Sequence, residues 1–106
     1  MTEIRTRQIE RRITRIKEGL AEVGPMRPGS LTQQYKVPKE KKGPYWQISF
    51  TRNMKSKSEY VRAECVPDIR KQIAAYKRFK KLTEEWIDLG IELSKLNMLR
   101  DKKKGS

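Results

Sequence analysis

The strongest strand signal of the chain is Tyr45-Trp46-Gln47-Ile48-Ser49-Phe50, and it decides the fold. Apolar and polar residues alternate there, so Trp46, Ile48 and Phe50 share one face of a strand. Residues 59–65 alternate in the same way, with Val61, Ala63 and Cys65 on one face and Tyr60, Arg62 and Glu64 on the other. The two segments predict a β-hairpin over residues 45–65, with a polar and basic tip from Thr51 to Ser58.

One face of this hairpin is apolar and needs a helix to cover it, because an isolated hairpin is marginal in water. Residues 66–100 predict that helix, since Pro67 suits a first helical turn and an apolar seam follows at alternating steps of three and four. We expect the seam to be buried, and Ile87 and Ile91 broaden it enough for more than one partner helix. The seam residues are Phe79, Leu82, Trp86, Leu89, Leu93 and Leu96.

A second amphipathic helix is predicted over residues 1–23, and Gly24-Pro25 ends it. Its seam is Ile9, Ile13, Ile16, Leu20 and Val23. Residues 24–44 are proline-rich and read as a loop with a candidate short strand at Leu31–Val37, while residues 101–106 read as a basic tail. The sequence therefore predicts one α+β domain, in which the two helices pack as an antiparallel pair within a homodimer.

The composition points away from catalysis and toward a polyanionic partner. Lys and Arg number 26 against 13 Asp and Glu, which gives a formal net charge of +13. There is no histidine, and the single cysteine, Cys65, is expected to be a buried structural thiol. A neutral-pH general base and a Cys–His nucleophile are absent, so we expect no enzyme activity, no metal and no cofactor. The acidic residues Glu84, Glu85, Asp88 and Glu92 are expected to form a solvated helix face.

The basic residues are placed where helix stability does not require them. Arg70 and Lys71 lie near the start of the long helix, where the dipole prefers acids. A phosphate backbone would account for them, whereas a polar face paired with acids of a partner helix is the plain alternative. Tyr45 and Tyr60, on the polar hairpin face, could stack on bases or simply contact each other across the strands. The candidate nucleic-acid-binding residues are Tyr45, Arg52, Lys55, Lys57, Tyr60, Arg62, Arg70, Lys71, Lys77, Arg78 and Lys81.

Three segments carry a resemblance to known proteins: the turn Gly29-Ser30-Leu31, the strand from Gly43 to Thr51, and the helical stretch from Tyr76 onward to Leu96. With these segments the chain resembles a family of small uncharacterised prokaryotic and phage proteins that are often found with mobile elements. The resemblance implies the same helix, hairpin and long-helix order and a mobile-element or phage setting. The family's cysteine knuckle is missing before Gly43, and Lys42 replaces its histidine, so the metal site of the family is lost.

The favoured function is a non-catalytic nucleic-acid-binding accessory or regulatory protein that contacts DNA or RNA phosphates through Lys and Arg. Two alternatives stay open: a coiled-coil protein-interaction module, and a small basic subunit of a larger nucleoprotein assembly. No apolar run approaches the roughly 18 residues of a membrane span, and a lone cysteine suits a reducing compartment. The sequence thus predicts a cytoplasmic protein without a membrane partner.

Overall fold

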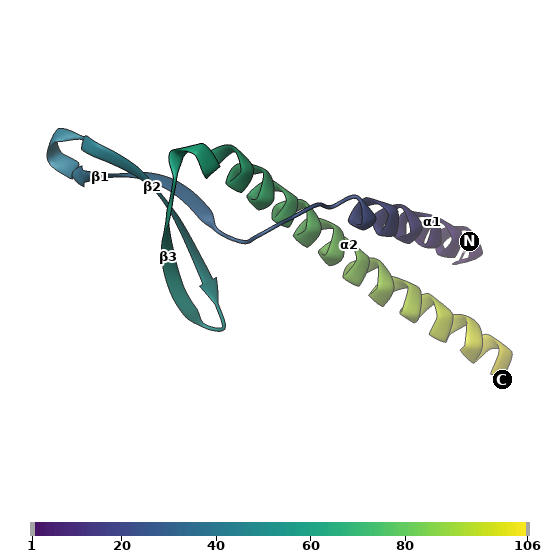
Figure 1. Cartoon of the computed structure of the whole chain (residues 1–106). Coiled ribbons are helices and arrows are strands. Elements are labelled where there is room, and N and C mark those ends of the chain that lie inside the picture. Colours follow the sequence, from purple (N-terminus) through teal and green to yellow (C-terminus); the bar gives the residue numbers. More distant parts are fainter. Residues whose placement is uncertain (1, 106) are drawn as a thin grey trace. The chain divides into compact units, whose positions relative to one another are not determined.

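The computed structural model describes residues 2–105, with side chains described for residues 2–102. The predicted α+β class is confirmed (Figure 1). Along the chain lie α1 (Thr2–Ala21), β1 (Ser30–Val37), the 3-10 turn η1 (Pro38–Glu40), β2 (Lys42–Arg52), β3 (Lys55–Val61), the 3-10 turn η2 (Ala63–Cys65) and α2 (Val66–Gly105). These elements form two units. We call Gly24–Lys77 the sheet unit, and we call Met1–Val23 with Arg78–Ser106 the helical pair.

The sheet has three antiparallel strands in the order β1-β2-β3. The candidate strand at Leu31–Val37 is confirmed as β1. The eight-residue tip predicted between Thr51 and Ser58 is wrong, because β2 and β3 continue toward each other until only Asn53 and Met54 separate them. Both turn residues have positive φ, 53° and 65°. This is the backbone of a tight two-residue hairpin turn, whose twist matches that of the strands.

The strand predicted to reach residue 65 ends at Val61. Ala63–Cys65 form η2 instead, closed by the amide of Cys65 donating to the carbonyl of Arg62 at 2.9 Å. The chain leaves the sheet to enter α2, so strand alternation no longer decides where Cys65 points. Its thiol is exposed, and the expectation of a buried structural cysteine is wrong.

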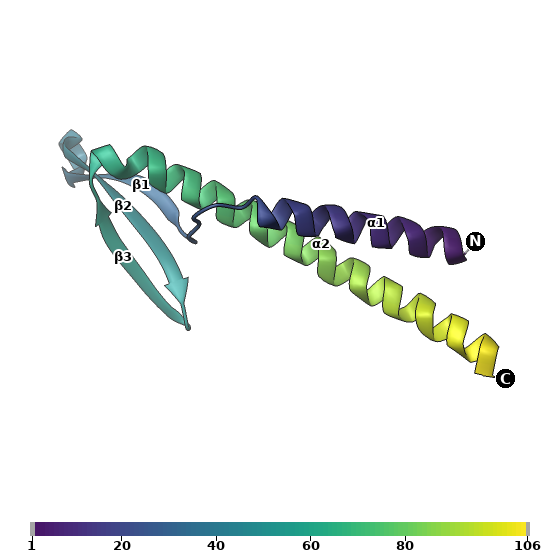
Figure 2. The ribbon, with the colours of Figure 1, turned by 45° about the vertical axis from the view of Figure 1, so that its right-hand side comes forward.

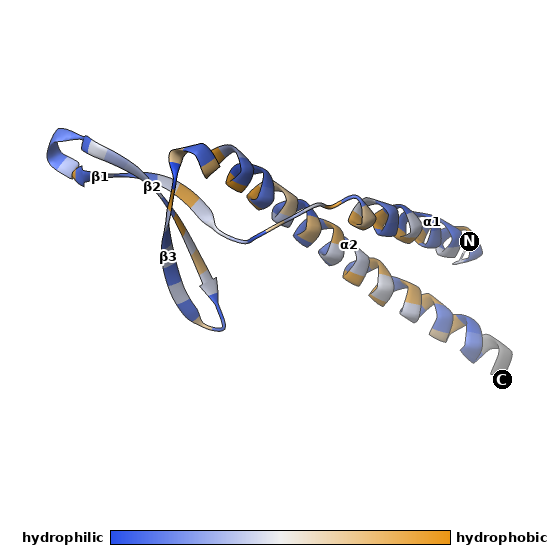
Figure 3. Ribbon diagram, in the orientation of Figure 1, coloured by the Kyte–Doolittle hydropathy of each residue, from blue (hydrophilic) through white to orange (hydrophobic). Residues whose placement is uncertain are grey.

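The first turns of α2 cover one face of the sheet. Ile48 is fully buried at the centre, and Val61 and Val66 are buried beside it. Ile69 and Ile73 of α2 pack against these three side chains, together with Leu31 and Trp46. Hydropathy colouring shows the apolar residues of the strands and of this part of α2 (Figure 3). The helix that the hairpin requires is therefore supplied by residues 66–77 of the chain itself.

The helical pair is held by α1 running antiparallel to the later part of α2 (Figure 2). Arg5 donates to both carboxylate oxygens of Glu92 at 2.6 and 2.8 Å, and Arg12 donates in the same bidentate manner to Glu85. Arg5 and Arg12 are seven residues apart on α1, and Glu85 and Glu92 are seven residues apart on α2. Seven residues make about two helical turns, so both ion pairs can form when the two helices run in opposite directions. Ile9, between Arg5 and Arg12, and Ile16, one turn beyond Arg12, are the buried residues of α1. The predicted antiparallel pair is confirmed.

The seam of α2 is less buried than predicted. Phe79, Leu82, Trp86, Leu89 and Leu93 are half-buried, while Ile87 and Ile91 are 61% and 51% exposed. One helix, α1, can cover only one side of an apolar stripe this wide. No helix among the described residues is both long enough and apolar enough to cross a membrane.

The long helix also continues further than predicted. It was expected to stop at residue 100 before a basic tail, but α2 runs to Gly105. No glycine or proline interrupts the chain between Ile91 and Lys104, so nothing in that stretch breaks the helix. Ser106 and the side chains of Lys103 and Lys104 lie outside the described residues.

Candidate nucleic-acid interface

Positive charge is concentrated in the sheet unit. It contains twelve Lys and Arg against four Asp and Glu, a net charge of +8. Three of these cations lie within 4 Å of a carboxylate, in the pairs Arg27–Glu59, Lys42–Glu40 and Arg62–Glu64. The other nine have no acidic partner among the side chains that the structure describes: Lys36, Lys39, Lys41, Arg52, Lys55, Lys57, Arg70, Lys71 and Lys77. Such charges are available to an outside anion.

The hairpin turn carries three of the predicted cations. Arg52 pairs with Lys55 directly beside the turn, and Lys57 pairs with Phe50 two residues further along the strands. All three side chains are exposed. Because alternate residues face opposite sides, these cations lie on the side of the strands that carries Phe50, and Tyr45 and Tyr60 belong to the other side. The predicted tip and the predicted tyrosines are therefore two separate features of the sheet.

The opposite face of the sheet is polar and uncovered by α2. The register places Gln34 opposite Tyr45, Tyr60 opposite Gln47, and Ser49 opposite Ser58. The hydroxyls of Ser49 and Ser58 lie 3.2 Å apart, so they share a hydrogen bond. No carboxylate belongs to this face in β1, β2 or β3. A shallow hollow at one end of the face is lined by Tyr35, Lys36, Pro44, Tyr45 and Tyr60.

The start of α2 adds a second basic hollow. Arg70 stacks on the ring of Trp46, with its guanidinium carbon 5.2 Å from the ring centroid. Arg70 and Lys77 are two turns apart and line one hollow with Gly29, Ser30 and Leu31 at the start of β1. Lys71 is exposed beside them. Stacking on a ring orients the guanidinium of Arg70 without using its N–H donors.

Arg78 and Lys81 belong to the helical pair, and they follow Lys77 by one and four residues along α2. Arg78 lies 3.8 Å from Glu22, the residue that follows α1, as the plain alternative of pairing with acids requires. Hydrogen bonds from Arg12 lower the pKa of Glu85 below its ordinary value of 4.5, and the charge of Lys81 lowers it further. These two cations therefore act at least in part on acids of the protein. Glu85 and Glu92 are paired, so the predicted solvated acidic face is reduced to Glu84 and Asp88.

Sequence reasoning missed Lys36, Lys39 and Lys41 as site residues. The prediction of a loop over residues 24–44, with only a candidate strand at Leu31–Val37, assigns these lysines to no surface of the sheet. The signal was present: alternation through Leu31, Gln33, Tyr35 and Val37 assigns Lys36 to the other face. That face carries Tyr45 once β1 pairs with β2.

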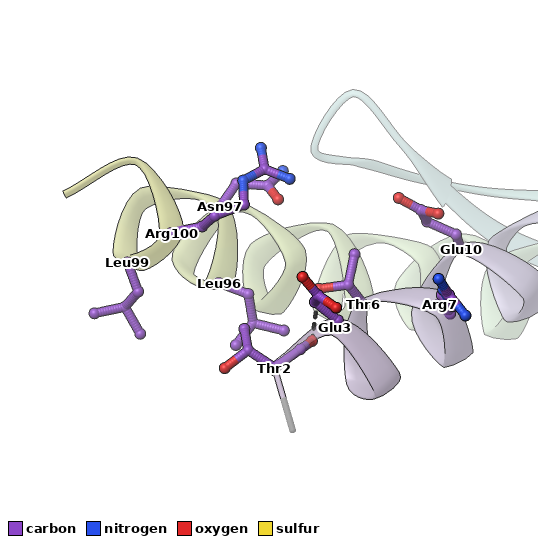
Figure 4. Close-up of a pocket in the computed structure, with 9 residues that line it drawn as sticks. All are labelled: Thr2, Glu3, Thr6, Arg7, Glu10, Leu96, Asn97, Leu99 and Arg100. Atoms are coloured by element: carbon purple, nitrogen blue, oxygen red, sulfur yellow. Dashed lines mark hydrogen bonds between the residues drawn. The ribbon is translucent and has the colours of Figure 1, made fainter. Parts of the chain in front are cut away.

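The helical pair has a hollow of its own at the free ends of the helices. It is lined by Thr2, Glu3, Thr6, Arg7 and Glu10 of α1 and by Leu96, Asn97, Leu99 and Arg100 of α2 (Figure 4). Two carboxylates and two guanidinium groups balance in charge, so this hollow does not favour an anion. No group of three or more potential metal-ligating side chains occurs among the described residues.

Comparison with known proteins yields one family. Residues 6–71 match the model of a domain of unknown function (DUF6788), which covers most of α1, the whole sheet and the first turns of α2. Neither the search of curated proteins nor the search of solved structures finds a match. The matched residues are well over half of the chain. They include the hollow on the uncovered sheet face and the basic hollow at the start of α2, except for the three α2 residues of the latter that follow Lys71. The chain is a member of the DUF6788 domain family.

Proposed function

We propose that this chain is a non-catalytic nucleic-acid-binding protein that contacts phosphates through the sheet unit. The observation that carries the proposal is the set of nine sheet-unit cations without an acidic partner among the described side chains. Charge that is not neutralised inside the protein attracts polyanions from solution and releases their counterions on contact. The expected role is accessory or regulatory, in the cytoplasm, within the mobile-element or phage setting that the sequence resemblance implies.

The helical pair serves as the internal comparison for this proposal. It has fourteen Lys and Arg but also nine Asp and Glu, so its net charge is +5. Arg5, Arg12 and Arg78 contact carboxylates across the pair. Those cations stabilise the protein itself, and they contribute less to the attraction of an outside anion.

The test is a salt series on duplex and single-stranded 20-mers, read by fluorescence anisotropy. Phosphate-driven binding predicts that log K falls linearly with log salt, by about 0.9 per phosphate contact on duplex and about 0.7 on single strands. The triple variant Arg52→Gln/Lys55→Gln/Lys57→Gln removes exposed cations at the hairpin turn. For this variant the slope of log K against log salt should be shallower, by the equivalent of up to about three phosphate contacts.

A matched control removes the same charge from the helical pair. Arg7, Arg11 and Arg15 are exposed and form no ion pair among the described side chains, so Arg7→Gln/Arg11→Gln/Arg15→Gln changes net charge equally. The proposal expects a smaller change of slope in this control. Equal loss in both variants would show that the sheet unit is not the contact surface. Absence of binding at about 50 mM salt would rule out the function itself.

A second candidate function is a coiled-coil interaction module, formed by α2 of two copies. Ile87 and Ile91 are exposed, and a Cβ on Gly90 between them would meet no atom within 4 Å. An antiparallel crossing at Gly90 would bring Glu84 of each copy toward Lys95 of the other. Light scattering across a concentration series tests it: a dimer that Ile87→Glu/Ile91→Glu converts to monomer supports this module, and a monomer at all concentrations excludes it.

A further inference from the structure

The hollow on the uncovered sheet face has the composition of a site for a planar ring beside a negative charge. Three tyrosines, a lysine and a proline line it, namely Tyr35, Tyr45, Tyr60, Lys36 and Pro44. Tyr60 is 70% exposed, although aromatic side chains of this size are usually packed. Tyr45 is half-buried beside it and forms the more fixed wall.

The register explains why the two rings are neighbours. Tyr60 pairs with Gln47, so Tyr45 lies two residues along β2 from the position opposite Tyr60. Diagonal neighbours on adjacent antiparallel strands are about 7–8 Å apart, which is within reach of aromatic side chains. Lys36 lies on β1 next to this pair, opposite Gly43. Gly43 has no side chain, which leaves room for that of Lys36, because a Cβ on Gly43 would lie 3.0 Å from the Lys36 Cβ.

The rest of the face can form hydrogen bonds but carries no negative charge. Gln47 and the hydroxyl pairs Ser49–Ser58 and Thr51–Ser56 continue along β2 and β3 from the hollow. Amide and hydroxyl groups can both donate and accept, so they suit the polar edges of bases without selecting one base. A carboxylate, which would repel a phosphate chain, is absent from this face of the three strands.

We propose that Tyr60, Tyr45 and Lys36 form a base-stacking site, so that the sheet face takes single-stranded rather than double-stranded nucleic acid. This inference rests on the proposed nucleic-acid-binding function and specifies the strand state of the ligand. A base of a single strand stacks on Tyr60 against the wall made by Tyr45, and Lys36 contacts the adjoining phosphate. Bases within a duplex are stacked on each other, so their ring faces are not available to a tyrosine.

The experiment compares a single-stranded 12-mer with a duplex of the same length, by anisotropy at one moderate salt concentration. The wild-type protein should bind the single strand more tightly. Tyr60→Ala should weaken single-strand binding by roughly 5- to 150-fold, the loss expected for one stacked base. Tyr60→Phe keeps the ring and should stay within about 2-fold of wild type. Duplex binding should be nearly unchanged in both variants.

Met54→Ala is the matched control, because Met54 is 99% exposed in the turn of the same sheet and does not line the hollow. Circular dichroism should show the same folded content in all variants, as expected for exposed positions.

Equal binding of both strand states, or no effect of Tyr60→Ala, overturns the stacking site while leaving the proposed function in place. A loss in Tyr60→Phe as large as in Tyr60→Ala also overturns stacking, because it assigns the effect to the hydroxyl. Failure to bind either ligand at about 50 mM salt rejects the proposed function as well.

Discussion

The helical pair and the sheet unit both hold an excess of arginine and lysine, but they place these side chains against different partners. Arg5 and Arg12 of the helical pair each donate two hydrogen bonds to one carboxylate. In the sheet unit, Arg70 lies over the ring of Trp46, with its guanidinium carbon 5.2 Å from the ring centroid. A carboxylate occupies the N–H donors of a guanidinium, whereas an aromatic ring leaves most of them free.

The difference teaches that the number of cations alone does not locate a binding surface. An aromatic partner fixes the position of a cation without cancelling its charge, and the net charge of the sheet unit is +8 because it holds only four carboxylates against twelve cations. The helical pair also contains one cation beside an aromatic ring, since Lys17 Nζ lies 5.4 Å from the centroid of the Trp86 ring. Each unit contains one tryptophan, Trp46 or Trp86, so single-tryptophan variants can report on the two units separately.

The largest expected effect comes from truncating the core of each unit. Ile48 and Ile16 are both fully buried, one in the sheet unit and one in the helical pair. Ile48→Ala and Ile16→Ala should each cost about 2–5 kcal/mol of unfolding free energy. Urea titrations should show the first variant shifting mainly the Trp46 transition and the second mainly the Trp86 transition. Identical shifts at both tryptophans would mean that the two units unfold as one.

The next effect tests the backbone of the sheet unit. Gly29 has a φ of +144°, and a Cβ there would lie 2.8 Å from two side-chain carbons of Ile48. Gly29→Ala combines left-handed strain with overpacking, so we expect a loss of about 1–3 kcal/mol, measured by thermal unfolding at Trp46. Gly24→Ala is the control, because a Cβ at Gly24 meets nothing within 4 Å. A neutral Gly29→Ala would contradict the close packing of Gly29 against the side chain of Ile48.

Two glycines sharpen the description of the helical pair. Gly90 lies in α2 with open space around it, so Gly90→Ala should raise the unfolding free energy by about 0.5–1 kcal/mol through helix propensity. Gly19 lies in α1, and a Cβ there would come 3.3 Å from Leu82 Cδ1. Gly19→Ala should therefore gain less than Gly90→Ala, or lose stability, in melts followed by circular dichroism. The reverse order would contradict the open space around Gly90 or the close approach of Gly19 to Leu82.

The smallest expected effect is a pH dependence confined to the helical pair. Hydrogen bonds from Arg12 and Arg5 lower the pKa of Glu85 and of Glu92 in the folded protein. Their stabilisation is complete above the ordinary glutamate pKa of 4.5 and is lost as pH falls through the lower folded values. The Trp86 melting temperature should drop in that range.

Glu85→Gln/Glu92→Gln should flatten this drop. The control Glu84→Gln/Asp88→Asn should keep it, because these acids form no ion pair among the described side chains. An acid-induced drop that survives in Glu85→Gln/Glu92→Gln would show that other carboxylates hold the helical pair together.

Apolar periodicity predicted the helices and the central strand correctly, because burial of one face imposes the period. Apolar periodicity failed to predict the ends of the strands, where no face is buried. The strands extend past Phe50 into polar sequence, where backbone pairing alone maintains them and Thr51 pairs with Ser56. The turn at Asn53 and Met54 could not be predicted from Met54, because a positive φ is unusual for a residue other than glycine or asparagine.

The candidate site was predicted in composition but not in arrangement. Tyr45 and Tyr60 were correctly assigned to the polar face, because strand parity is readable from sequence. Arg78 was assigned to a ligand, although Glu22 lies near it, because a partner 56 residues away cannot be identified from local charge. One signal was available: Arg5 and Arg12 have the same spacing as Glu85 and Glu92, as an antiparallel ion-paired helix pair requires.

The strand order β1-β2-β3 also has a consequence for how the chain folds. Each strand pairs with its neighbour in sequence, so the sheet closes only short loops, whereas the contact between Arg5 and Glu92 spans 87 residues. Closing a loop costs entropy that grows with its length, and folds rich in local contacts form faster. The sheet is therefore expected to fold first, shortening the free chain that α1 must close to reach α2. The region proposed to bind nucleic acid would then be the earliest to become structured as the protein folds.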